Sequence, residues 1–125
     1  MIMGIHHICM KCQSTEELQN TIRFYTEILG LPIVRSWKGG TMLGCGDSLI
    51  ELFDNATEPP VPGIIAHVAM ATDNVDAIVK KVRDAGYKIT VEPKDIVIPS
   101  EKPYPARIAF CIGPLGEEIE FFCEK

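Results

Sequence analysis

The sequence lacks several features that would assign it to a specialised class of protein. No apolar run approaches the length of a membrane-spanning helix, so we expect no membrane span. Basic residues form no cluster or stripe and the net charge is −5, which argues against nucleic acid or an anionic membrane surface as a partner. The first residues lack the charged and apolar segments of a signal peptide, so we expect a cytoplasmic protein.

Cysteine use also argues against a secreted disulfide framework. The five cysteines are an odd number, and without an export signal we expect them to be reduced thiols. Cys9 and Cys12 have the spacing of a redox or metal motif, but residues three apart in a strand face opposite sides. We therefore expect neither a disulfide nor a shared metal between them.

What is present is a chain of ordinary globular composition, with 125 residues of which 46% are apolar. This length suffices for one compact domain with a real core. A proline-rich linker at residues 58–63 separates a first module, residues 1–57, from a second, residues 64–125. Neither module is large enough to bury a core alone, so the two are expected to form a single domain.

The two modules repeat one order of elements: a strand, a helix and three further strands. The first module predicts strands at 5–12, 33–37, 41–45 and 48–54, with a helix between Ser14 and Gly30. The second predicts strands at 64–71, 87–91, 106–112 and 117–123, a helix from Asn74 to Ala85, and a long loop at 92–105. The sequence therefore predicts an α+β fold of two βαβββ modules that form curved, eight-stranded mixed sheets.

Each module has a histidine early and a glutamate late, both inside strand-like apolar runs. In the first strand, Ile8 and Met10 share a face with His6, and the smaller face carries His7. The bulky face should pack on the helices, so His7 rather than His6 is the expected partner of His67 across a concave face.

The two glutamates, Glu51 and Glu120, lie among apolar neighbours, where an unpaired carboxylate would be costly. Taken singly, each histidine could be a hydrogen-bonded core residue and each glutamate could face solvent. Their matching positions in two modules favour one shared role. Two His and two Glu form a complete ligand set for one divalent transition metal.

A wider set of phrases accompanies these four residues. They are His7-Ile8-Cys9-Met10, Ile22-Arg23-Phe24-Tyr25 with Leu29-Gly30-Leu31, Ile50-Glu51-Leu52, His67-Val68-Ala69-Met70, Gly86-Tyr87 and Gly116-Glu117-Glu118-Ile119-Glu120-Phe121. Together they resemble the vicinal oxygen chelate superfamily, which includes glyoxalase I, bleomycin-resistance proteins and extradiol dioxygenases. The ligand types most resemble glyoxalase I of the short bacterial type, the lactoylglutathione lyases.

The resemblance implies that His7, Glu51, His67 and Glu120 bind one divalent metal, with Ni²⁺, Zn²⁺, Co²⁺ and Mn²⁺ all compatible. It implies an isomerase that converts the hemithioacetal of methylglyoxal and a thiol into a lactoyl thioester through an enediolate. Glu120 is the expected base, with Glu51 as the second candidate. The resemblance also implies a homodimer. Lys11 stands near the place of the family's arginine.

Further substrate-binding candidates are Asn55, four residues beyond Glu51, and Lys102 and Arg107, beside the long second-module loop. Asn55 matches a glutathione-contacting asparagine of the glyoxalases, and the two basic residues could meet an acidic substrate. Other readings stay open because one fold hosts many chemistries. They are an epimerase such as methylmalonyl-CoA epimerase, a resistance enzyme, and a non-catalytic protein that binds a small molecule.

Overall fold

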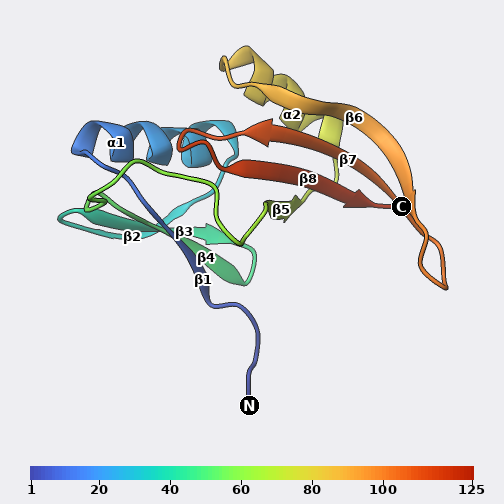
Figure 1. The fold of residues 1–125 in the computed structure, drawn as a ribbon, viewed down its shortest axis with the longest axis horizontal. Coiled ribbons are helices and arrows are strands. Elements are labelled where there is room, and N and C mark those ends of the chain that lie inside the picture. Colours follow the sequence, from blue (N-terminus) through green and yellow to red (C-terminus); the bar gives the residue numbers. More distant parts are fainter. The chain divides into compact units, whose positions relative to one another are not determined.

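The computed structural model describes all residues from 1 to 125, and these form two compact units (Figure 1). The first unit is Met1–Val61 and the second is Pro62–Lys125. The boundary lies inside the linker predicted at residues 58–63. That the two units together form one domain stays a prediction.

The first unit contains β1 (His7–Lys11), α1 (Thr15–Arg23), a π-helical turn η1 (Phe24–Ile28), β2 (Ile33–Trp37), β3 (Gly40–Cys45) and β4 (Ser48–Phe53). Its sheet has the strand order β1-β4-β3-β2, with β1 parallel to β4 and the other neighbours antiparallel. Ser14 caps α1 by accepting a hydrogen bond from the Glu17 backbone N–H at 3.0 Å.

The second unit repeats this topology with β5 (Val68–Ala71), α2 (Val75–Asp84), β6 (Ile89–Ile98), β7 (Tyr104–Ile112) and β8 (Glu118–Glu124). The strand order is β5-β8-β7-β6, again with the outer pair β5 and β8 parallel. The predicted α+β fold of two βαβββ modules is thus confirmed. The strands form one four-stranded mixed sheet in each unit.

The predicted loop at residues 92–105 is wrong, because most of it extends two strands. β6 continues to Ile98 and β7 begins at Tyr104, which leaves only residues 99–103 between them. Pro93 suggested a break, but it lies where the β6–β7 register shifts, between Val91 and Lys94. A bulge on an edge strand is a place where the missing N–H of proline disrupts no ladder.

In each unit a helix packs on one face of the sheet. Helix α2 packs on β6, β7 and β8 through Val75, Val79 and Val82, which are fully buried. In the first unit, the buried Ile50 and Leu52 of β4 alternate with residues that face the other way. Glu51 and Glu120 therefore lie on the sheet faces opposite the helices.

No helix in the chain combines the length and the apolar character that a membrane span requires.

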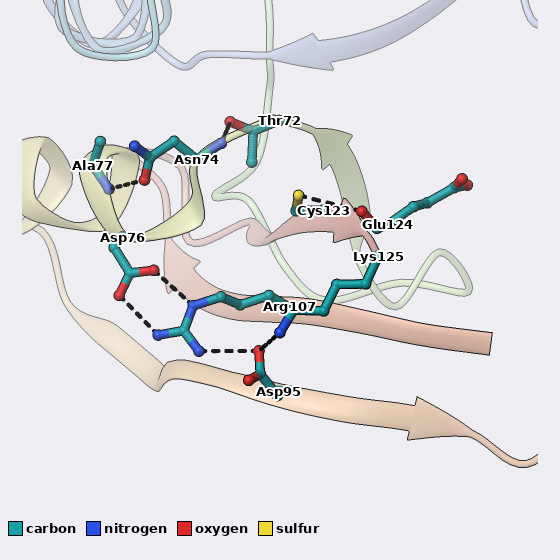
Figure 2. Close-up of polar contacts among 9 residues, drawn as sticks. All are labelled: Thr72, Asn74, Asp76, Ala77, Asp95, Arg107, Cys123, Glu124 and Lys125. Carbon is teal, nitrogen blue, oxygen red and sulfur yellow. Dashed lines mark hydrogen bonds and ion pairs between the residues drawn. The ribbon is translucent and has the colours of Figure 1, made fainter. Parts of the chain in front are cut away.

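Replacing Asn74 with alanine should destabilise the chain by about 1 kcal/mol. The Asn74 side chain accepts a hydrogen bond from the Ala77 backbone N–H at 3.0 Å at the start of α2 (Figure 2). Urea unfolding measures the loss. Asn20→Ala, in the exposed interior of α1, is the matched control and should change stability by less than about 0.5 kcal/mol. Equal effects of both substitutions would contradict the capping role.

Candidate functional site

The first histidine–glutamate pair connects the two parallel strands of the first sheet. His7 Nε2 lies 3.5 Å from Glu51 Oε1. The pairing of β1 with β4 places Cys9 opposite Glu51, so His7 approaches the carboxylate from the next position on the same face. The Glu51 side chain is only 13% exposed and that of His7 is 38% exposed, so the carboxylate is the more deeply held partner.

The second pair has the same construction in the other unit. His67 Nε2 lies 3.0 Å from Glu120 Oε2, and the side chains are 38% and 11% exposed. His67 immediately precedes β5, and its ring meets the ring of Phe110 edge-on with centroids 5.3 Å apart. Phe110 is the register partner of Glu120 on β7, so one aromatic ring packs beside both members of the pair.

Both pairs have the spacing that two ligands of one metal would have. Two donor atoms each about 2.1 Å from a metal are roughly 3.0 Å apart in octahedral geometry and roughly 3.4 Å apart in tetrahedral geometry. The observed separations of 3.0 Å and 3.5 Å agree with these values. The donor set also fits, because imidazole and carboxylate suit Ni²⁺, Zn²⁺, Co²⁺ and Mn²⁺.

His6 contacts the ring of His7 instead of a carboxylate. Its Nδ1 lies 2.9 Å from the Nδ1 of His7, so one ring donates a hydrogen bond to the other. This contact occupies the Nδ1 side of His7 while the Nε2 side faces Glu51. A partner on one ring nitrogen fixes which nitrogen can bind a metal.

One protein family matches most of the length of this chain. Residues 4–121 match the family model of the Glyoxalase/Bleomycin resistance protein/Dioxygenase superfamily. The chain belongs to this superfamily.

Curated relatives within the superfamily carry two different activities in their names. The chain is 28% identical over 121 residues to the lactoylglutathione lyase of Escherichia coli O157:H7, which covers 87% of this chain and 86% of the relative. It is 27% identical over 99 residues to glutathione transferase FosA of Serratia marcescens, covering 75% of this chain and 68% of the relative.

Solved structures of the superfamily share the fold. A glyoxalase family protein from Bacillus anthracis superposes with a TM-score of 0.74 at 20% identity, covering 100% of this chain and 98% of that one. A glyoxalase/bleomycin resistance protein/dioxygenase from Nocardioides gives 0.69 at 21% identity, covering 97% and 83%. At these identities the likeness establishes the fold alone.

Three of the predicted substrate-binding residues are exposed and make no ion pair within their units. Lys11 ends β1 on the same face as His7, opposite Phe53 in the register of β4. Asn55 lies two residues beyond the end of β4, and Lys102 lies in the short connection between β6 and β7. Their roles in binding stay predictions.

Arg107 is bound to two carboxylates instead of pointing freely from its strand (Figure 2). Its Nε and Nη2 donate to Asp76 of α2 at 2.6 and 2.8 Å, and its Nη1 donates to Asp95 of β6 at 3.1 Å. Lys125 Nζ also contacts Asp95, at 2.8 Å. Strand alternation puts Arg107 on the helix-covered face, opposite Phe110. Its predicted part in substrate binding is untested, and the observed contacts are structural ones.

Cys9 is a neighbour of the first pair and was not among the site residues predicted from the sequence. It lies opposite Glu51 in the register of β1 and β4 and is exposed. Partial burial raises the pKa of its thiol, and the charge of Glu51 and a hydrogen bond to its carboxylate raise that pKa further. Strand alternation already placed Cys9 on the face of His7, so that signal was present in the sequence.

Glu51→Gln should accelerate alkylation of Cys9, because removing the neighbouring negative charge lowers the thiol pKa and raises the thiolate fraction. The measurement is the rate of iodoacetamide modification at pH 8 in chelator-treated protein, resolved by peptide mass spectrometry. Cys45 is an internal control, because burial alone raises its pKa. A Cys9 rate that changes no more than the Cys45 rate would count against the contact.

The Arg107 network should make stability depend on acidic pH. Hydrogen bonding to Arg107 lowers the pKa of Asp76, and bonds from Lys125 and then Arg107 lower that of Asp95. Lowered carboxyl pKa values stabilise the fold above the unfolded-state pKa of about 3.9, and the stabilisation is lost as pH falls through the folded-state values.

Arg107→Gln should therefore weaken the fall in stability between pH 7 and pH 3, measured as the urea midpoint at each pH. Arg23→Gln is the control, since Arg23 contacts only the amide oxygen of Asn20. Identical pH profiles for wild type and Arg107→Gln would contradict a stabilising network.

Proposed function

We propose that this chain is a metal-dependent isomerase of the glyoxalase I type. It would convert the hemithioacetal of methylglyoxal and a thiol into a lactoyl thioester. The observation that carries the proposal is the equivalence of the two pairs, His7 with Glu51 and His67 with Glu120, in spacing and in burial. The lactoylglutathione lyases among its relatives support the same activity.

The number of ligands that a bound metal requires supports the binding of one ion by both pairs. One pair supplies two protein ligands, and a metal bound by protein side chains usually has at least three. Two pairs supply two neutral imidazoles and two carboxylates, whose charge balances that of a divalent cation. Six-coordinate geometry would then leave two adjacent positions for two oxygens of one substrate.

The two pairs can come from one chain or from two, and we propose a homodimer as the working assembly. The five free cysteines fit a reducing, cytoplasmic setting, where a low-molecular-weight thiol is at hand to form the hemithioacetal. Lys11 and Asn55 are the proposed contacts for the thiol part of the substrate.

The proposed chemistry is a proton transfer between neighbouring carbons. A bound divalent ion would stabilise negative charge on the two adjacent substrate oxygens, as a Lewis acid does. Glu120 accepts the proton from the carbon that carries sulfur and hydroxyl and returns it to the former ketone carbon, while the hydroxyl proton moves to the former ketone oxygen. No atom is gained or lost. Glu51 is the alternative base because its pair is built in the same way.

A second candidate is transfer of a thiol to an oxyanion substrate, which is favoured by the likeness to glutathione transferase FosA. Resistance enzymes of that kind resemble this chain less in one respect, because they typically use two His and one Glu as ligands. Glu51 as a fourth ligand therefore favours the isomerase. Formation of a glutathione–fosfomycin adduct without lactoyl thioester would reverse this preference.

Glu120→Gln should lower kcat for lactoyl thioester formation by roughly 10²- to 10⁴-fold, because the amide cannot accept the proton. The assay uses methylglyoxal with glutathione or bacillithiol and protein purified without chelator or affinity tag, with metal per chain measured by mass spectrometry. Glu118→Gln, two residues earlier on the same face and exposed, is the matched control and should stay near wild type. The proposal would be contradicted if wild-type protein retained no metal and formed no lactoyl thioester from methylglyoxal and either thiol.

A further inference from the structure

The side chains around Glu51 form a row across the first sheet. Strand register aligns Cys9 with Glu51, Glu51 with Met42, and Met42 with Arg35. Register partners point to the same face of a sheet, so Arg35 shares the face of Glu51 at a distance of two strands. Arg35 is thus a basic residue on this face that was not among the site residues predicted from the sequence.

The next row on the same face ends in a tryptophan. Lys11 aligns with Phe53, Phe53 with Gly40, and Gly40 with Trp37. The Trp37 and Phe53 rings meet with centroids 5.8 Å apart. A Cβ on Gly40 would lie 2.5 Å from the indole, so glycine lets the ring lie close over β3. Trp37 and Phe53 therefore form an aromatic surface on this face, beside Arg35.

The equivalent rows of the second unit have a different chemistry. The row through Glu120 contains Ala69, Phe110 and Val91. Alanine and valine thus stand where the first unit has Cys9 and Arg35.

The following row of the second unit also differs, because Ala71 stands in the place of Lys11 and Lys94 lies on the edge strand. One row further on, an acid, Glu124, accepts a hydrogen bond from Tyr104.

The first face carries two basic strand residues besides the carboxylate of Glu51. Lys11 and Arg35 are the basic strand residues on that face, and Glu51 is the acidic one. Neither basic side chain makes an ion pair in its unit, in contrast to Arg107 of the second unit. An exposed arginine without a carboxylate partner is available to an anionic ligand.

We propose that Arg35 determines specificity by binding an oxyanion, most simply a carboxylate, at the end of the substrate remote from its chelating oxygens. Neighbouring strands lie about 4.8 Å apart, so the backbones of Arg35 and Glu51 are separated by roughly 10 Å. Side chains stand roughly perpendicular to a sheet, so the ends of the two side chains can be a similar distance apart. That distance fits a substrate whose chelating oxygens and remote oxyanion are joined by a spacer of a few carbon atoms. The inference rests on the proposed metal function.

The experiment compares two chelating probes that differ in one charge: glutaric acid monohydroxamate and its methyl ester. Both carry the vicinal oxygens that bind a divalent metal. Dissociation constants for Zn²⁺-loaded protein come from calorimetry, and emission of Trp37, the only tryptophan, reports whether the probe lies at this face. Wild type should bind the anionic probe roughly tenfold more tightly than the ester, and the ratio should fall as salt rises.

Arg35→Gln should bring that ratio close to one while the affinity for the ester stays unchanged. Arg35→Lys should retain part of the preference. Lys38→Gln, an equal loss of charge in the adjoining turn, should retain all of it. An unchanged ratio in Arg35→Gln, with the ester still bound through the metal, would overturn the role of Arg35 alone. In that case Arg35 would serve only as a charged side chain that keeps the edge strand β2 from pairing with another chain.

Absence of metal-dependent binding of either probe would contradict the metal site, and with it this inference. The two failures are distinguishable because the neutral ester tests the metal and the anionic probe tests Arg35. Equal binding of both probes by wild-type protein would overturn the proposed preference for an anionic substrate while leaving the metal site in place.

Discussion

The contact between a buried carboxylate and an imidazole is the constraint on which the rest of this structure depends. A carboxylate inside an apolar strand loses much of its hydration, and a polar partner offsets the cost of that loss. Glu51 and Glu120 have that partner in His7 and His67. The strands, the helix-covered faces and the parallel pairing all serve to bring these side chains together.

The repeat gives each unit its own histidine–glutamate pair, and the two pairs share a framework but differ in their surroundings. In each unit a glutamate of the last strand lies beside the histidine at the start of the unit's first strand, while the neighbouring residues differ. In the first unit these neighbours are Cys9 and Arg35, and in the second unit they are Ala69 and Val91. A duplicated framework can thus keep the histidine–glutamate pair constant while the residues around one copy of it change.

Much of this arrangement could be predicted from the sequence because it follows from local patterns. Strand alternation selected His7 over His6, and the repeat linked Glu51 with Glu120. The true extent of β6 could not be predicted, because Pro93 indicates a break unless a bulge is known. The binding of Arg107 by Asp76 and Asp95 brings together three distant segments, and the row joining Arg35 to Glu51 depends on strand register. Neither follows from sequence spacing.

The parallel pairing of β1 with β4, and of β5 with β8, has a consequence for how the pairs arise during folding. Parallel neighbours cannot be joined by a tight hairpin, so a helix and two strands intervene between each histidine and its glutamate. A fragment that contains only the first strand and the helix of a module lacks the glutamate of its pair. Each pair therefore requires its module to have reached its last strand, and loop-closure entropy opposes an earlier encounter.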